Sequence, residues 1–319
     1  MDKEISGIHH VTTIASDPQQ NVDFYSDVLG LRLIKLTVNF DDPGTYHLYY
    51  GDESGNPGTI LTFFPWPGAR RGRQGTGQVG VTSFLVPEGT LDYWQERMRR
   101  MAIAVTERER RFDEEYLALV DQDGTRLELV ARPGAAEIRP WEGGPVEPGC
   151  AIRGFHGVTL WEKDPEPTAT LLGNVFGFQL VEESGPRFRF RAPGSGPGTT
   201  VDLYHLPGQE RGTDGAGAVH HVAWRTGDDA QQLAWRRELI DKGLHVTPVM
   251  DRQYFHSIYF REPGGVLFEI ATDPPGFLID ESLAELGSRL RLPPWIESRR
   301  AEVEAALPRL VLPGSRAHG

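Results

Sequence analysis

Apolar and polar positions alternate along this chain in one order that is repeated four times. Each unit opens with a short apolar run of the strand type, such as HHVTTI at residues 9–14. An amphipathic stretch follows, as in Asn21–Leu29 and Asp229–Lys242, and Gly30 and Gly243 stand where such helices would end. Extended runs separated by glycine-containing turns complete the unit. The pattern therefore predicts a βαβββ module that occurs four times.

Two ungapped internal repeats, at spacings of 147 and 141 residues, support this division. The matched segments are residues 7–34 with 154–181 and residues 78–130 with 219–271. Identical residues occupy equivalent positions in both repeats, among them His9/His156, Gly30/Gly177, Trp94/Trp235, Arg111/Arg252 and Glu128/Glu269. Repetition over such lengths indicates modules of one architecture.

The repeats indicate two similar halves of two modules each. We expect an N-terminal half over residues 1–132, a linker over residues 133–151 and a C-terminal half over residues 152–272. The linker is assigned because this stretch is rich in proline, glycine and charged residues. The predicted fold class is α+β, with curled sheets that face one another.

A C-terminal extension follows over residues 273–319, where the composition changes. Its pattern predicts two helices, over residues 280–290 and 295–307, and two prolines precede the second. We expect this extension to cap the second half of the chain.

The composition narrows the classes of function. The 319 residues carry a net charge of −12, which argues against partners such as nucleic acid or anionic lipid, because both need a basic face. The single cysteine, Cys150, can form neither an internal disulfide nor a thiolate metal site. No basic N-terminal region precedes an apolar stretch, and no apolar run reaches the ~18 residues of a membrane span. We expect a cytoplasmic protein without a membrane partner, and a homo-oligomer stays open.

Two positions in each module can carry chemistry, one in the opening strand and one in the last strand. The opening positions hold His10, Gly80, Gly157 and His221, and the closing positions hold Thr62, Glu128, Asp202 and Glu269. If modules one and four share a cavity, it contains two imidazoles and one carboxylate, the set of non-haem Fe(II) oxygenases. Modules two and three offer no imidazole, and the other pairings separate the histidines. We therefore predict one metal site with the ligands His10, His221 and Glu269.

The sequence also predicts roles for the residues next to these ligands and for the remaining histidines. Because side chains two apart share a face of a strand, only one histidine of each pair should enter the pocket directly. His221 would then face the pocket, and His220 would support it or reach the substrate from the side. We interpret Glu128 as structural and paired with an arginine, because its module lacks the histidine. Three other histidines are interpreted as ordinary: His47, His205 and His245.

The hairpin before Glu269 is rich in reactive side chains. Tyr259 and Arg252 reach the predicted pocket only if this hairpin folds back over Glu269. The alternative is that Tyr259 is a core aromatic residue whose hydroxyl is satisfied elsewhere.

At these residues the sequence resembles the vicinal oxygen chelate superfamily, and within it the dioxygenases that cleave the ring of hydroquinones. The resemblance covers most of the chain and rests on the motifs GIHHVT, NFDDPGTYHLYYG, GTILTFFPW, HHVAW, RQYFHSIYFREPGGVLFEIATD and, in the extension, LPPW. It implies Fe(II) bound by His10, His221 and Glu269. It also implies supporting or catalytic roles for His9, Thr12, His220, Arg252 and Tyr259.

The same resemblance implies a small aromatic substrate and O2. A phenolate and O2 would react at the metal, and a hydroquinone-type or catechol-type ring would open beside its hydroxyl. His9 or His220 would act as acid or base, and Arg252 and Tyr259 would orient the substrate oxygen. Mn(II) accepts the same ligands and stays an alternative to Fe(II).

Two other classes share this fold and stay open. One is a glyoxalase-like isomerase or thiol transferase, whose metal keeps its redox state. The other is a metal-free protein that binds and sequesters a small molecule. The two-histidine, one-carboxylate set favours oxygen chemistry over both.

Overall fold

The computed structural model describes residues 3–313. Residues 1–2 of the predicted N-terminal half and residues 314–319 of the predicted extension lie outside the described residues. All four modules have the predicted order of one strand, one helix and three strands. Among the helices of the described residues, none is long and apolar enough to cross a membrane.

The first two modules have the following bounds. Module one contains β1 (Ile8–Ala15), α1 (Pro18–Val22) continued by the π-helical turn η1 (Asp23–Val28), β2 (Arg32–Asn39), β3 (Asp42–Gly51) and β4 (Ile60–Pro65). Module two contains β5 (Gln78–Pro87), α2 (Leu91–Arg100), β6 (Glu109–Arg111), β7 (Glu114–Val120) and β8 (Arg126–Arg132). A 3₁₀ turn, η2 (Ala135–Glu137), begins the linker.

The last two modules repeat this order. Module three contains β9 (Phe155–Glu162), α3 (Glu166–Thr170) continued by η3 (Leu171–Val175), β10 (Gln179–Ser184), β11 (Arg187–Arg191) and β12 (Thr200–His205). Module four contains β13 (Val219–Thr226), α4 (Asp229–Asp241), β14 (Met250–Asp251), β15 (Phe255–Arg261) and β16 (Leu267–Pro275).

Local sequence explains where the helices begin and end. The Asp17 side chain accepts a hydrogen bond from the backbone of Gln20 and caps α1, and Asp228 caps α4 in the same way. Gly30 and Gly243 have φ of +71° and +87°, the left-handed conformation that favours glycine after a helix. The predicted helix ends are therefore confirmed.

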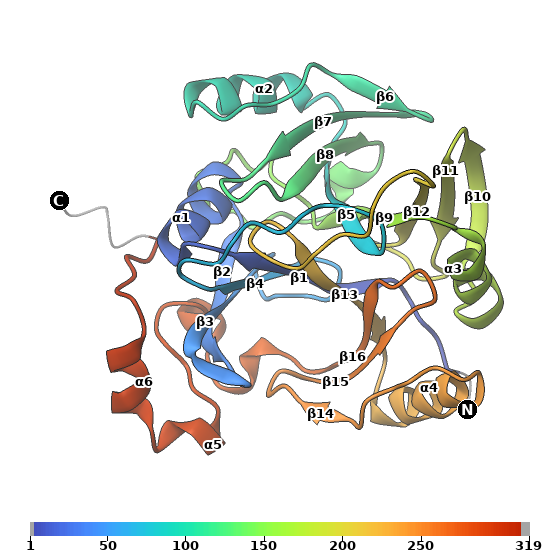
Figure 1. Ribbon diagram of the computed structural model, residues 1–319. Helices are drawn as coiled ribbons and strands as arrows, with labels where there is room; N and C mark the ends of the chain where they lie inside the picture. The colour runs from blue at the N-terminus through green and yellow to red at the C-terminus, as the bar shows by residue number, and fades with distance from the viewer. Residues whose placement is uncertain (1–2, 314–319) are drawn as a thin grey trace.

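The strands form two eight-stranded sheets, and each sheet takes one module from each half of the sequence. The first sheet has the order β14-β15-β16-β13-β1-β4-β3-β2, which joins modules four and one. The second has the order β10-β11-β12-β9-β5-β8-β7-β6, which joins modules three and two. In Figure 1 the central strands β1, β13, β5 and β9 lie together in the middle of the molecule. The α+β class and the predicted pairing of modules are confirmed, whereas the domain boundaries stay a prediction.

The C-terminal extension differs from its prediction. Residues 280–290 do not form a helix, but contain η5 (Leu283–Glu285) after the turn η4 (Phe277–Ile279). The segment then runs along the edge strand β2, where the Arg291 backbone N–H donates to the Leu36 carbonyl over 2.9 Å. The absence of a side chain at Gly287 allows this close approach, because a Cβ there would lie 1.9 Å from the Leu33 carbonyl oxygen. Pairing with the open sheet edge thus replaces the predicted helix.

The second predicted helix of the extension is divided into α5 (Pro294–Glu297) and α6 (Arg300–Ala306). Ile296 and Val303 are buried with Val38 of β2 in a small apolar cluster. These helices therefore pack mainly on module one. The prediction that they cap the second half of the chain was wrong. Figure 1 shows α5 and α6, in red, on the side of the molecule where β3 lies.

Candidate metal centre

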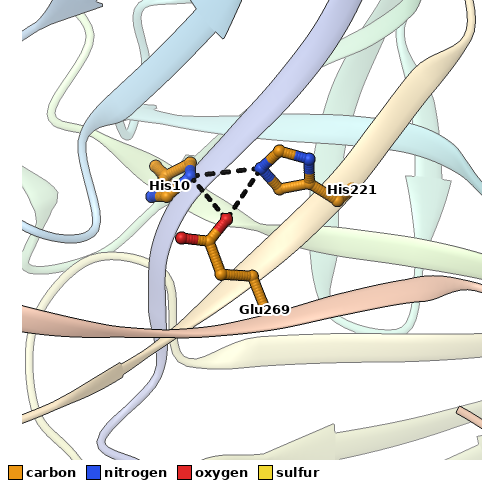
Figure 2. Close-up of side chains that lie close together, drawn as sticks. All are labelled: His10, His221 and Glu269. Carbon is orange, nitrogen blue, oxygen red and sulfur yellow. Dashed lines mark hydrogen bonds and ion pairs between the residues drawn. The ribbon is translucent and has the colours of Figure 1, made fainter. Parts of the chain in front are cut away.

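Three ligand-type side chains converge from adjacent strands of the first sheet. His10 lies on β1, His221 on β13 and Glu269 on β16, and all three are buried. Nε2 of His10 lies 3.3 Å from Nε2 of His221 and 3.2 Å from Oε2 of Glu269, and the last pair, His221 to Glu269, is 2.9 Å apart. Figure 2 shows the three groups pointing at one another. The structure thus brings together the three predicted ligands.

The donor set fits a divalent metal ion. Oε1 of Glu269 accepts a hydrogen bond from Ser257, but the buried Oε2 accepts none of normal geometry from the described residues. Burial alone would raise the pKa of Glu269, yet His10 and His221 hold this pKa well below its usual range, so the carboxylate stays charged. Burial lowers the pKa of His221 despite the nearby Glu269, which leaves a neutral imidazole. Neutral imidazoles and a carboxylate are ligands for Fe(II) and Mn(II).

Each candidate histidine ligand lies close to the histidine before it. The Nδ1 atoms of His9 and His10 lie 2.9 Å apart, and those of His220 and His221 lie 2.7 Å apart. A ligand that offers Nε2 to a metal keeps its proton on Nδ1, so each ligand would donate this proton to the neighbouring ring. The two neighbours would thereby fix the orientation of both ligands.

Two β-bulges produce this arrangement. In the ladder between β1 and β13, the register skips His9 on one strand and His220 on the other. A bulge adds one unpaired residue and redirects the side chains around it. His220 therefore lines the same cavity as His221, although strand alternation predicted that only one of them would enter it directly. His9 lies outside that lining and contacts Phe255, at 5.0 Å between ring centroids.

A cavity of about 260 Å³ opens above the triad. Aromatic side chains form much of its wall, namely Phe40, Tyr49, Phe64, Trp66, Phe255 and Tyr259. Polar groups complete it: Thr12, Asn39, Asp41, His47, His220 and Arg252. Flat aromatic walls with a few convergent polar groups suit a small aromatic ring.

Tyr259 and Arg252 reach this cavity because the hairpin folds back as required. Tyr259 on β15 lies directly opposite Glu269 on β16, and Nε of Arg252 donates to its hydroxyl over 3.3 Å. Gln253, at a φ of +66°, makes the tight turn between Arg252 and β15. Burial and the charge of Glu269 raise the pKa of Tyr259, so this residue keeps its proton. Tyr259 is therefore a wall of the site and not an isolated core aromatic.

His47 is a cavity residue that the sequence analysis missed. Its Nε2 lies 2.9 Å from the Thr62 hydroxyl, and its Nδ1 lies 2.9 Å from the Tyr49 hydroxyl. The Thr62 hydroxyl in turn lies 2.9 Å from that of Thr12, which lines the cavity as expected. The signal was the alternation of TYHLYYG, which puts His47 and Tyr49 on one face of β3.

Comparison with known proteins identifies the family. Residues 7–129 and 154–270 match the model of the Glyoxalase/Bleomycin resistance protein/Dioxygenase superfamily. The chain belongs to this superfamily. It is 51% identical to the Bacillus subtilis protein named "Putative ring-cleaving dioxygenase MhqO", over 96% of this chain and 97% of that protein. It is 34% identical to "Chlorohydroquinone/hydroquinone 1,2-dioxygenase" of Sphingobium indicum, over 95% of this chain and 96% of that protein.

Solved structures agree with this assignment. The crystal structure described as a putative dioxygenase from Bacillus subtilis matches with a TM-score of 0.93 and 50% identity, over 98% of this chain and 99% of that one. Glyoxalase I from Zea mays matches with a TM-score of 0.64 at 16% identity, over 85% of this chain and 93% of that one, and shares the fold. The relatives at 34–51% identity place this superfamily member among enzymes of the ring-cleaving dioxygenase type.

The second sheet explains why the part of the chain that the structure describes has a single candidate centre. A Cβ at Gly80 would lie 2.2 Å from the Trp161 ring, and a Cβ at Gly157 would lie 2.1 Å from the Thr200 carbonyl oxygen, so neither position can hold a histidine. Glu128 is bound by both terminal nitrogens of Arg111, at 2.9 and 2.7 Å, which confirms its structural interpretation. Within residues 3–313, His10, His221 and Glu269 are the one cluster of three metal-ligating groups.

Proposed function

We propose that this protein is an Fe(II)-dependent dioxygenase that opens the ring of a hydroquinone-type substrate with O2. The observation that carries the proposal is the convergence of two imidazoles and one carboxylate under an aromatic cavity. The name of the Sphingobium relative, a chlorohydroquinone/hydroquinone dioxygenase, supports this substrate class over catechols. When bound, Fe(II) supplies the one-electron chemistry by which O2 reacts with an electron-rich ring.

The aromatic walls would hold the ring flat above the triad. Phe64 and Phe255 are apolar walls of the cavity, and Tyr259 closes it beside Glu269. Exclusion of water by these rings would strengthen the polar contacts inside the cavity. A ring without a bulky substituent fits the volume of about 260 Å³.

Tyr259 and Arg252 would orient the substrate hydroxyl. The Tyr259 hydroxyl can donate one hydrogen bond toward the ring, because it keeps its proton and already accepts from Arg252. The guanidinium adds a positive charge beside the oxygen as negative charge develops there. In the reacting complex, each donor atom would lie roughly 2.7–3.1 Å from the substrate oxygen.

His220 is our candidate for the group that donates a proton to a reacting oxygen, because its Nδ1 would accept from His221 and the neutral ring then carries its proton on Nε2. It lines the cavity, whereas His9 does not, and this difference favours His220 among the two histidines. His9 would instead hold the His10 ring in place through the contact between their Nδ1 atoms. Thr12, held by Thr62, would complete the polar wall next to His10.

The decisive experiment is O2 uptake by anaerobically Fe(II)-loaded protein on addition of hydroquinone, with metal content measured on the same sample. We expect one O2 consumed per ring, loss of the aromatic absorbance and a product heavier by one O2. Glu269→Gln should abolish uptake, and the equivalent variant in the second sheet, Glu128→Gln, should retain it. Bound metal without O2 uptake on any hydroquinone or catechol would instead favour an isomerase or transferase, and absence of metal binding would favour a binding protein. Parallel loading with Mn(II) tests the choice of metal.

A further inference from the structure

A second cavity lies directly outside the metal cavity. Its volume is about 320 Å³, and its walls are Phe40, Asp41, Met250, Asp251, Arg252 and Trp295. Phe40, Asp41 and Arg252 line the metal cavity as well. The two cavities therefore share one wall, and a molecule in this outer cavity is separated from the metal cavity by those three side chains.

Trp295 gives the outer cavity a fixed aromatic surface. Its side chain is 50% exposed, which is unusual for an indole, and its ring meets Phe40 edge to face at 5.5 Å between centroids. The next residue, Ile296, is buried against Val38 of β2 together with Val303. The C-terminal extension is thus anchored on the sheet and holds an exposed ring over the approach to the metal cavity.

The other walls suit a neutral phenolic ring. The Met250 thioether makes favourable contacts with aromatic rings, and the Arg252 guanidinium can stack on a ring face. Asp41 and Asp251 can accept hydrogen bonds from phenol hydroxyls. Two carboxylates against one guanidinium leave a net negative charge, so an uncharged ring is favoured over an anionic one.

The shared wall can open at low cost. Arg252 bridges the two cavities, with Nε to the Tyr259 hydroxyl at 3.3 Å and Nη1 to Asp41 at 3.0 Å. The Asp41 side chain is 65% exposed and that of Arg252 is 17% exposed, so water can replace the guanidinium as a partner of this carboxylate, and the ion pair contributes less than a buried one. Asp41 can therefore leave Arg252 while the guanidinium stays on Tyr259.

We propose that the outer cavity binds the neutral dihydroxybenzene on its way to the metal, with Trp295 as the ring-binding wall. This inference rests on the proposed function, because it takes the substrate to be such a ring. It assigns the C-terminal extension a part in substrate capture and not in the chemical step. It also predicts selection against anionic rings before they reach the metal.

The first test compares Trp295→Ala with the conservative variant Trp295→Phe in steady-state O2 uptake on hydroquinone. Removal of one aromatic wall should lower kcat/KM by about 3- to 10-fold and leave kcat within about 2-fold. Trp295→Phe should keep most of kcat/KM, because it keeps a ring. An unchanged kcat/KM in Trp295→Ala, or an equal fall in kcat, would overturn the proposal.

A second test needs neither metal nor turnover. The NMR signals of the hydroquinone ring protons are recorded under nitrogen in the presence of chelator-treated protein, and their broadening on binding is measured. The two variants are compared after their thermal midpoints have been shown to be equal. Trp295→Ala should reduce the broadening severalfold relative to Trp295→Phe, and equal broadening would contradict the outer site. Because no O2 is consumed, this result stands even if the wild-type protein proves not to cleave hydroquinone.

A third variant tests whether the negative charge of the outer cavity selects against anionic rings. Asp251 lines the outer cavity and not the metal cavity, and its Oδ1 accepts from the Gln253 backbone, a bond that asparagine can also accept. Asp251→Asn should raise kcat/KM for 2,5-dihydroxybenzoate relative to hydroquinone by severalfold. An unchanged ratio would remove the outer carboxylates from substrate selection.

Discussion

Tyr259 lies directly opposite Glu269 in the antiparallel ladder of β15 and β16. Residues opposite one another in a ladder project to the same face of the sheet, so the Tyr259 hydroxyl lies on the same face as the carboxylate of the candidate metal centre. Burial and the charge of Glu269 raise the pKa of Tyr259, which keeps the hydroxyl as a hydrogen-bond donor. The ladder register itself therefore sets a proton donor beside the candidate metal.

Replacement of Tyr259 by phenylalanine should separate metal binding from turnover. The hydroxyl touches Arg252 and is not among the three convergent ligands, so metal content should stay at the wild-type level. Loss of one donor to the developing charge should lower kcat by at least about 10-fold. Metal analysis and O2 uptake on one preparation check both parts. A wild-type rate would remove Tyr259 from the mechanism.

The three ligands should be individually necessary for tight metal binding. His10→Ala, His221→Ala and Glu269→Ala each remove one of three convergent donors, and each should abolish retention of metal after gel filtration. Glu128→Ala is the matched control, because Glu128 occupies the equivalent strand position but binds Arg111. Equal loss of metal from Glu128→Ala would refute the assignment of the site to modules one and four.

Lys35 should be essential for the attachment of the extension. Its buried ammonium group donates to Asp280 over 2.6 Å and also to the buried Glu281. Lys35→Met leaves the Glu281 carboxylate buried with less compensation and should lower the free energy of unfolding by about 3 kcal/mol. Urea denaturation measures this change. The exposed Lys242→Met is the control, and the double variant Lys35→Met/Glu281→Leu should recover much of the loss because neither fully buried charge of the Lys35–Glu281 pair remains.

Glu162 should make stability fall as pH rises. It is fully buried, neither of its oxygens accepts a hydrogen bond from the described residues, and burial together with the charge of Glu262 raises the pKa of Glu162 to about 9. The unfolded value is about 4.3. Between these values the folded chain holds a proton that the unfolded chain has released, so the free energy of unfolding decreases with pH, by at most about 1.4 kcal/mol per pH unit.

Glu162→Gln should remove this decline. Glutamine keeps the shape and does not titrate, so the thermal midpoint should rise relative to wild type at pH 8 and converge with it near pH 5. The exposed Glu166→Gln on α3 serves as the control. Parallel pH profiles for wild type and Glu162→Gln would contradict a protonated Glu162 in the folded state.

The three side chains of the candidate metal centre could be predicted because their signal is local and repeated. The periodicity of apolar residues indicates the order of strands and helix in each module. Comparison of equivalent positions in the repeated modules then identifies His10, His221 and Glu269. The same comparison identified Glu128 as a structural residue, since its module lacks a histidine. Short-range patterns and repeats survive in the sequence whatever the distant parts of the chain do.

The sequence by itself thus determined four modules, their pairing and the three side chains that converge at the candidate metal centre. Only the tertiary structure decided that bulges at His9 and His220 redirect the tandem histidines, because a bulge depends on the register of two strands more than 200 residues apart. It also decided that His47 faces the cavity and that residues 280–290 lie along β2 instead of forming a helix. These features depend on which surface each segment meets, and a contact with a distant surface leaves no periodic mark in the segment itself.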